Sequence, residues 1–400
     1  MAADLTAGRP TVHSVPEIES QLGTLWARAR KRTAGEGEHH IAARSNVLNL
    51  VVVAGHRETA ERCAATIAGT AGRHPSRSLI LSTADADGPA GFDAHVQVLS
   101  VATPAGTGET DAEMIYVTAH GDTGRHLASL IVPLLVHDLP VALWWPHDPQ
   151  FRSHRADRLV PIADRLIVDG SSWSGNGLDR LAEMARQART RGLVVADFSL
   201  LKQARWREAI ASVYDLPDLR PHLRAVRSIT VEYAAAEDED STGLTNVVRP
   251  VYHVAWLASR LGMTVVQPLR RGPDGRRAAT LRQGNHQLAV ELRPVCSDLS
   301  GGSTVSVEIA SRLRGAELVG AVTATDRVVD VVVRDKGRER ARRAYVAPRL
   351  NDVDLLVLAV EDTSGAPVAA EALAMAGQLA AAEPTRVRQP KGEEVDHDRA

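Results

Sequence analysis

In the first half of the chain, short runs of apolar residues alternate with stretches in which apolar residues recur every three or four positions. The runs are rich in Val, Ile and Leu, which is typical of strands buried on both faces, and the longer stretches are typical of amphipathic helices. The predicted strands are residues 47–53, 77–82, 141–145 and 163–169, and the predicted helices are residues 15–32, 58–71, 178–191 and 200–213. Strands that alternate with helices usually pair in parallel. This half is therefore predicted to be a mostly parallel α/β sheet.

Two segments depart from that alternation. Residues 95–101 and 113–119 are predicted strands with no helix between them, which favours an antiparallel pair. Residues 127–135 have the apolar spacing of a helix, but Pro133 lies inside the pattern. Proline lacks a backbone N–H, so a kink or a short interruption is expected there.

From about residue 227 the pattern becomes dominated by strands. Segments with alternating apolar positions are joined by Gly/Asp turns, and two further helices are predicted at 247–261 and 368–379. We predict an α/β protein whose mostly parallel N-terminal sheet domain is followed by a smaller, strand-rich α+β domain. The predicted divisions are a helical lead at 1–43, the α/β domain at 44–226, the α+β domain at 227–382 and a disordered tail at 383–400.

Composition narrows the class of protein. A chain of 400 residues with 44% hydrophobic and 24% charged residues is typical of a globular protein with two or three domains. Its formal charge of −2 gives no general attraction to nucleic acid or to an anionic membrane. We expect no membrane-spanning segment and no secretory signal, because no apolar stretch is long enough and the first residues are polar. The two cysteines are far apart, which fits a reducing cytoplasm.

The motifs of the common enzyme classes are missing. The turn after the first strand, AGHRETAE, has the single glycine Gly55, whereas a dinucleotide fingerprint needs three. The sequence has no phosphate-binding P-loop, no HExxH zinc motif and no GxSxG nucleophile motif. Two isolated cysteines and scattered histidines do not form a metal set. We therefore expect no cofactor, no metal and no catalytic residue.

Two places remain as candidate sites. The HPSR segment places His74, Ser76 and Arg77 at the start of a strand, where they could bind phosphate or carboxylate; the alternative is a turn with surface charges. Trp144 and Trp145 end a strand at the edge where open α/β sheets bind ligands. The alternative for the tryptophans is that they pack on opposite faces of the sheet.

Asp138 and Asp148 flank the tryptophan strand and could serve a site there. A structural role as helix cap or turn residue is the favoured interpretation for both, because a short carboxylate readily accepts hydrogen bonds from nearby backbone N–H groups.

Several segments taken together resemble one family. They are HPSR at 74–77, PLLVHDLPVALWWP at 133–146, ADRLIVD at 163–169, KQARWREAIASVYD at 202–215, AWLASRLG at 255–262 and AVELRP at 289–294. In this order they are similar to the OpcA family of glucose-6-phosphate dehydrogenase assembly proteins. The resemblance spans about residues 44 to 300, and the final hundred residues match less clearly.

The resemblance implies a non-catalytic protein of the oxidative pentose phosphate pathway that binds glucose-6-phosphate dehydrogenase and promotes its active oligomer. By segment match, the implied partner-binding residues are His74, Ser76, Arg77, Trp144, Trp145, Arg205 and Arg207. Trp206 fits an inner helix stripe instead, so packing is favoured for it. The alternative function is a sensor or enzyme for a phosphorylated sugar, with an anion site at His74 to Arg77.

Overall fold

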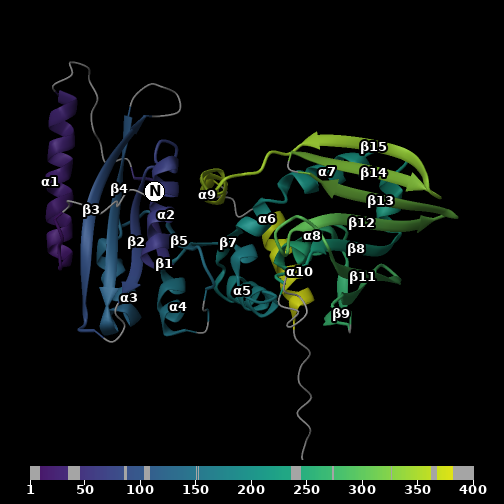
Figure 1. The fold of residues 1–400 in the computed structure, drawn as a ribbon, viewed down its shortest axis with the longest axis horizontal. Coiled ribbons are helices and arrows are strands. Elements are labelled where there is room, and N and C mark those ends of the chain that lie inside the picture. Colours follow the sequence, from purple (N-terminus) through teal and green to yellow (C-terminus); the bar gives the residue numbers. More distant parts are fainter. Residues whose placement is uncertain are drawn as a thin grey trace, which may run out of the picture.

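The computed structural model describes residues 10–34, 46–84, 88–102, 109–149, 151, 153–235, 245–272, 274–325, 327–361 and 367–381. It contains one sheet of seven strands and one of eight, which lie at opposite ends of the molecule with helices between them (Figure 1). The predicted α/β fold class is confirmed. The exact domain limits stay predictions, and the proposed disordered tail at 383–400 lies outside the described residues.

The first sheet has the strand order β3-β4-β2-β1-β5-β6-β7. Its strands are β1 (Leu48–Gly55), β2 (Ser76–Ala84), β3 (Gly91–Ala102), β4 (Glu109–His120), β5 (Val141–Trp145), β6 (Arg165–Val168) and β7 (Val194–Asp197). All neighbours are parallel except β3 and β4, which confirms the predicted antiparallel pair. The order runs outward in both directions from β1, as in doubly wound folds.

Helices cover both faces of this sheet, which explains why β1 is buried from Leu48 to Ala54. The helices of this half are α1 (Val15–Ala34), α2 (Arg57–Thr70), α3 (Leu127–Ile131), α4 (His154–Leu159), α5 (Leu178–Arg191), α6 (Phe198–Leu201) and α7 (Ala204–Tyr214). The predicted interruption at Pro133 is confirmed, because α3 passes there into a 3₁₀ turn, η2 (Val132–Leu134). The helix predicted from 200 to 213 is wrong in its continuity, since α6 and α7 are separate.

The second sheet has the order β15-β14-β13-β12-β8-β11-β10-β9. Its strands are β8 (Val226–Ala234), β9 (Thr264–Arg271), β10 (Arg277–Gln283), β11 (His286–Val295), β12 (Thr304–Leu313), β13 (Ala316–Ala324), β14 (Val328–Asp335) and β15 (Arg338–Val346). Only β8 and β11 pair in parallel. Burial alternates along β10 because one face of the sheet carries the core and the other faces outward. Helix α8 (Val248–Arg260) contacts β8, β11 and β12.

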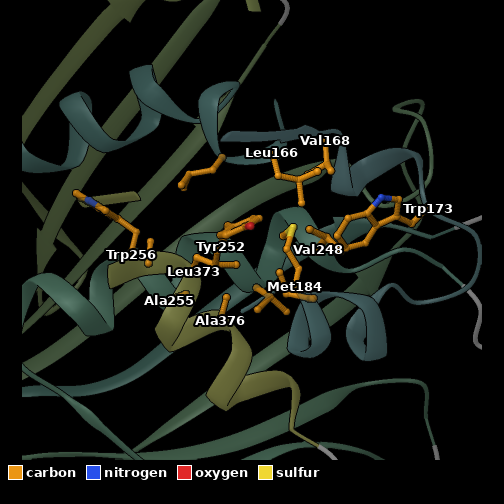
Figure 2. Packing of buried hydrophobic residues seen from close by; sticks show 14 of the residues in the cluster. Leu166, Val168, Trp173, Met184, Val248, Tyr252, Ala255, Trp256, Leu373 and Ala376 are labelled. Carbon is orange, nitrogen blue, oxygen red and sulfur yellow. The ribbon is translucent and has the colours of Figure 1, made fainter. Parts of the chain in front are cut away.

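The last two helices return to the first half of the molecule. Helix α9 (Asp352–Glu361) packs on α2 and α6, and α10 (Pro367–Ala380) packs between α5 and α8 (Figure 1). Figure 2 shows Leu373 and Ala376 of α10 gathered with Tyr252 and Ala255 of α8 and Met184 of α5. Helix α10 therefore joins the two halves through one continuous apolar core. Among the described residues, no helix is both long and apolar enough to cross a membrane.

Helix α10 approaches α5 closely because it has a glycine at the contact. A Cβ added at Gly377 would lie 2.4 Å from the Cβ of Ala185, much closer than two carbons can pack. Gly23 in α1 is different, since an added Cβ there would meet nothing within 4 Å. The two helical glycines therefore provide a matched pair.

We expect Gly377→Ala to destabilise the protein by about 1–3 kcal/mol, because the new methyl group must push α10 away from α5. Gly23→Ala should stabilise by about 0.5–1 kcal/mol, because alanine loses less backbone entropy on helix formation. Thermal and urea midpoints measure both changes. Equal stabilisation by the two substitutions would contradict the close contact of α10 with α5.

Candidate functional site

The strand order of the first sheet reverses at the carboxyl ends of β1 and β5, the place where doubly wound folds form their crevice. Ligands of doubly wound folds bind at this position. Here β1 ends at Gly55, which has φ +73°, and α2 begins after His56. Thr59 Oγ1 of α2 lies 2.6 Å from Nε2 of His147, the second residue after β5. A side-chain hydrogen bond therefore spans the crevice from α2 to the loop after β5.

The surroundings of His147 keep its ring neutral. Burial lowers the pKa of His147, and the positive charges of Arg62 and His56 lower it further. A neutral imidazole can accept a hydrogen bond from the Thr59 hydroxyl or donate one to its oxygen, depending on the tautomer. The hydrogen bond is thus compatible with neutral pH.

The two tryptophans of β5 point to opposite faces, as the strand alternation predicts. Trp144 belongs to the apolar cluster that contains Ile67 of α2, and its ring centroid lies 6.1 Å from that of Phe198. Trp145 belongs to the cluster on the other face, with Phe151. The exposed fractions of Trp144 and Trp145 are 4% and 6%. The packing interpretation is confirmed, and their contact with a partner stays a prediction.

The HPSR segment does not gather its side chains into one pocket. His74 Nε2 lies 3.2 Å from Glu361 Oε1 of α9, whereas Ser76 Oγ lies 2.8 Å from Ser78 Oγ. Arg77 is buried, so the interpretation of this segment as a turn with surface charges is wrong for that residue. A role of His74, Ser76 and Arg77 in partner or anion binding stays a prediction.

Arg77 forms the centre of a buried ion pair. Its Nε donates to Glu113 Oε2 at 2.5 Å, and its Nη1 donates to Glu19 Oε1 at 2.8 Å and to the Leu134 carbonyl oxygen at 3.0 Å. Glu113 is fully buried and also accepts from Trp26 Nε1 at 2.6 Å. Arg77 and Glu113 face each other in the register of β2 and β4. The guanidinium thus compensates a carboxylate of the protein itself.

A second polar network lies at the carboxyl ends of β6 and β7. Asp197 Oδ1 accepts from the N–H groups of Gly170 at 2.9 Å and Ser199 at 2.8 Å, and Oδ2 accepts from the Tyr252 hydroxyl at 2.9 Å. The bond from the N–H of Ser199 makes Asp197 the N-cap of α6. Burial and the negative charge of Asp169 raise the pKa of Asp197 to about 6.

The pKa of Asp169, in the same network, is shifted in the opposite direction to that of Asp197. Burial acts to raise its pKa, but the ammonium of Lys202, 2.8 Å away, and a hydrogen bond from Ser171 outweigh burial and lower it. Arg249 of α8 donates to Ser171 Oγ at 3.1 Å and to Ser303 Oγ at 3.2 Å. The network thus connects the first sheet with the start of α8 and the second half of the chain.

Helix α7 carries Arg205, Trp206 and Arg207, and of these three residues only Arg205 is exposed to solvent. Arg205 is exposed and donates to Glu208 at 2.6 Å. Arg207 is partly buried and donates to the Leu200 carbonyl oxygen at 2.6 Å, and burial lowers its pKa to about 10. Trp206 is buried with its ring centroid 4.9 Å from that of His253, which confirms the packing interpretation.

No sequence motif points to His253, yet its pKa is shifted further than that of any other histidine among the described residues. It is 1% exposed, and neither ring nitrogen has a hydrogen-bond partner. Burial, followed by the charges of Arg207 and Arg249, lowers its pKa to about 3. The ring is therefore neutral, and it acts as a packing residue against Trp206.

The flanking acids have structural roles. Asp138 lies in a turn with φ +67°, a conformation that aspartate tolerates better than most residues. Asp148 accepts from Ser174 Oγ at 3.0 Å and pairs with Arg180. The turn at Asp138 confirms the favoured interpretation for that residue, whereas Asp148 is held by two side chains and is neither a helix cap nor a turn residue.

A doubly wound, mostly parallel sheet joined to a large, mostly antiparallel sheet defines the class of this protein as a two-sheet α/β protein. Residues 64–186 match the family model described as the glucose-6-phosphate dehydrogenase subunit N-terminal domain, and residues 194–343 match that of its C-terminal domain. The chain belongs to the OpcA family.

One curated relative and two solved structures illustrate the similarity. The putative OxPP cycle protein OpcA of Synechocystis sp. is 26% identical over 155 residues, which are 38% of this chain and 30% of the relative. The chain thus matches less than a third of that protein. Glucose-6-phosphate 1-dehydrogenase from Mycobacterium avium has a TM-score of 0.47 at 12% identity, with 84% of this chain and 91% of the other covered. An NAD binding oxidoreductase from Klebsiella pneumoniae has a TM-score of 0.44 at 12% identity, with 82% and 94% covered.

We expect Arg77→Met to destabilise the protein by about 3–5 kcal/mol, because it leaves the Glu113 carboxylate buried without its partner. The double variant Arg77→Met/Glu113→Gln should recover most of that loss, since glutamine carries no charge and can still accept from Trp26. Urea unfolding of the two variants tests the pair. A double variant no more stable than Arg77→Met alone would contradict this account.

We expect the stability of the protein to depend on pH through His253. The unfolded imidazole takes up a proton near pH 6.5 and the folded one near pH 3, so between these values acid favours the unfolded state. The contribution of neutral His253 is present above pH 6.5 and is lost as pH falls toward 3. Asp197 acts oppositely, because its pKa is raised from 3.8 to about 6 and the folded state binds the extra proton.

The variant His253→Leu should remove the pH dependence due to His253 and leave that due to Asp197. Below pH 6.5 the free energy of unfolding of the variant, relative to that of the unaltered protein, should rise by about 1.4 kcal/mol for each unit by which the pH is lowered. Denaturant titrations between pH 4.5 and 7.5 measure the difference, with exposed His137→Leu as the control. Parallel pH profiles for His253→Leu and the unaltered chain would refute the assignment.

Proposed function

We propose that this protein is a non-catalytic assembly factor and allosteric activator that binds glucose-6-phosphate dehydrogenase and promotes its active oligomer in the oxidative pentose phosphate pathway. The observation that carries the proposal is the match of both halves of the chain to domains named for a subunit of that enzyme. We place the protein in the cytoplasm, which fits cysteines Cys63 and Cys296 that are both free.

The crevice of the first sheet supports a role without chemistry. A dinucleotide needs glycines that let the backbone approach its pyrophosphate, and the segment after Gly55 offers His56, Arg57 and Glu58 instead. The bond between Thr59 and His147 crosses the same crevice. Protein side chains are thus bonded to each other at the place where doubly wound folds receive a ligand.

The proposed activation follows from binding equilibria. If the protein binds the active oligomer of the dehydrogenase more tightly than its inactive form, it shifts the population toward the active oligomer. A coupling free energy of about 1–3 kcal/mol changes the equilibrium constant between the inactive and active forms by roughly five-fold to 150-fold. The protein needs no reactive group of its own for this.

Arg205 is the predicted partner-binding residue that is best placed for contact. It is exposed on α7, whereas Trp144, Trp145 and Arg77 are buried. Arginine is among the side chains that most often dominate interfaces. Arg189 on α5 is also exposed and provides a control of the same charge.

The test is to titrate the dehydrogenase of the same organism with this protein and to follow both oligomeric state and activity. We expect activity and oligomer to increase together and to saturate. Arg205→Ala should weaken the complex by about tenfold, and Arg189→Ala should not. A dehydrogenase whose mass and activity stay unchanged at every concentration would refute the proposal. Turnover of a metabolite by the isolated protein would also refute it.

A further inference from the structure

A basic pocket lies in the second half of the molecule, away from the crevice of the first sheet. Its volume is about 660 Å³, and three arginines line it, together with Leu223, Leu261 and Gln283. Arg220 and Arg224 come from a 3₁₀ turn, η5 (Arg220–Arg224), and Arg260 from the last turn of α8. Two segments far apart in sequence therefore place three guanidinium groups around one space.

The positive charge of this pocket is only partly neutralised by the protein. Arg260 forms an ion pair with Glu371 of α10. Within the part of the chain that the structure describes, Arg220 and Arg224 form no ion pair and no side-chain hydrogen bond, and both are exposed. They differ in this respect from Arg77, whose guanidinium is bound to Glu113 and Glu19.

The frame of the pocket is held in place by buried contacts. Gln283 at the end of β10 is 8% exposed, and its Nε2 donates to the Leu223 carbonyl oxygen at 2.8 Å. Its Oε1 accepts from the N–H of Val226 at 3.3 Å. His222, the central residue of η5, is buried, and its Nδ1 lies 3.2 Å from Ser311 Oγ. The backbone that carries Arg220 and Arg224 is thus fixed before any ligand binds.

We propose that this pocket binds a small phosphorylated metabolite. A phosphomonoester carries close to two negative charges, which the two uncompensated guanidinium groups of Arg220 and Arg224 match in number. The planar fork of arginine also fits phosphate oxygens in a bidentate manner. The volume lies within the range of about 300–1,000 Å³ that is usual for small-molecule sites.

The remaining surface of the pocket suits the carbon skeleton of such a ligand. Leu223 and Leu261 supply apolar contacts beside the arginines. A concave space of this size favours a compact molecule such as a sugar phosphate over an extended acidic protein segment. This inference is independent of the proposed function, because it needs no dehydrogenase.

The test is titration calorimetry of the full chain with inorganic phosphate, glucose 6-phosphate, glucose and succinate at constant ionic strength. We expect glucose 6-phosphate to bind more tightly than phosphate, and glucose and succinate not to bind. The double variant Arg220→Gln/Arg224→Gln should weaken glucose 6-phosphate binding about tenfold or more. Arg338→Gln/Arg340→Gln is the control, since these two exposed arginines lie on the edge strand β15.

Three results would overturn the proposal. They are a wild-type chain that binds no phosphorylated probe, a pocket variant that binds glucose 6-phosphate as tightly as the wild type, and a polyglutamate peptide that binds the wild type more tightly than glucose 6-phosphate does and loses this binding in the Arg220→Gln/Arg224→Gln variant. The last result would assign the pocket to an acidic protein segment. Circular dichroism and the thermal midpoint establish that the variants are folded, and binding to the dehydrogenase without phosphate is measured separately.

Discussion

The packing of α10 between α5 and α8 is the contact on which the arrangement of the two sheets depends. The helix is rich in alanine and has Gly377 where it meets Ala185, so its backbone can approach α5 closely. Its other side packs on α8, which lies against the second sheet. Because this segment comes last in the chain, the first sheet and the second sheet are joined by residues that follow both. The apolar core is continuous through this contact.

Several charged groups with little exposure are compensated by other groups of the described chain. Arg77 compensates Glu113, Lys202 compensates Asp169, and Tyr252 donates to Asp197. A buried charge with a partner costs far less than an isolated one, and its partner must lie at a defined place. These networks therefore fix the positions of strands and helices relative to one another. Arg220 and Arg224, which line the pocket between η5 and α8, have no such partner within the described residues.

The proposed function and the crevice of the first sheet are physically consistent. A doubly wound sheet provides a ligand site at its switch point through geometry alone, but binding also requires close backbone approach and free space. In this chain, larger side chains follow Gly55, and the hydrogen bond from Thr59 to His147 crosses the opening. A protein built in this way can act through its outer surface, by binding one form of a partner more tightly than another.

The sequence by itself determined the elements whose signals are local. Apolar runs placed β1, β5 and β6, the proline rule placed the break at Pro133, and strand alternation placed Trp144 and Trp145 on opposite faces. The OpcA resemblance rested likewise on contiguous segments. These features depend on residues only a few positions apart, because backbone geometry and the spacing of apolar residues determine local secondary structure.

Only the tertiary structure decided which distant residues meet. The sequence shows Arg77 only as a basic residue at the start of a strand, and the fold places the buried Glu113 of a neighbouring strand beside it. Helix α9 and the position of α10 against α5 were not visible in local patterns, and neither was the pocket formed by η5, α8 and β10. The physical reason is that partner choice for a charge or a helix face depends on which elements the folded chain brings together. Local periodicity carries no information about that choice.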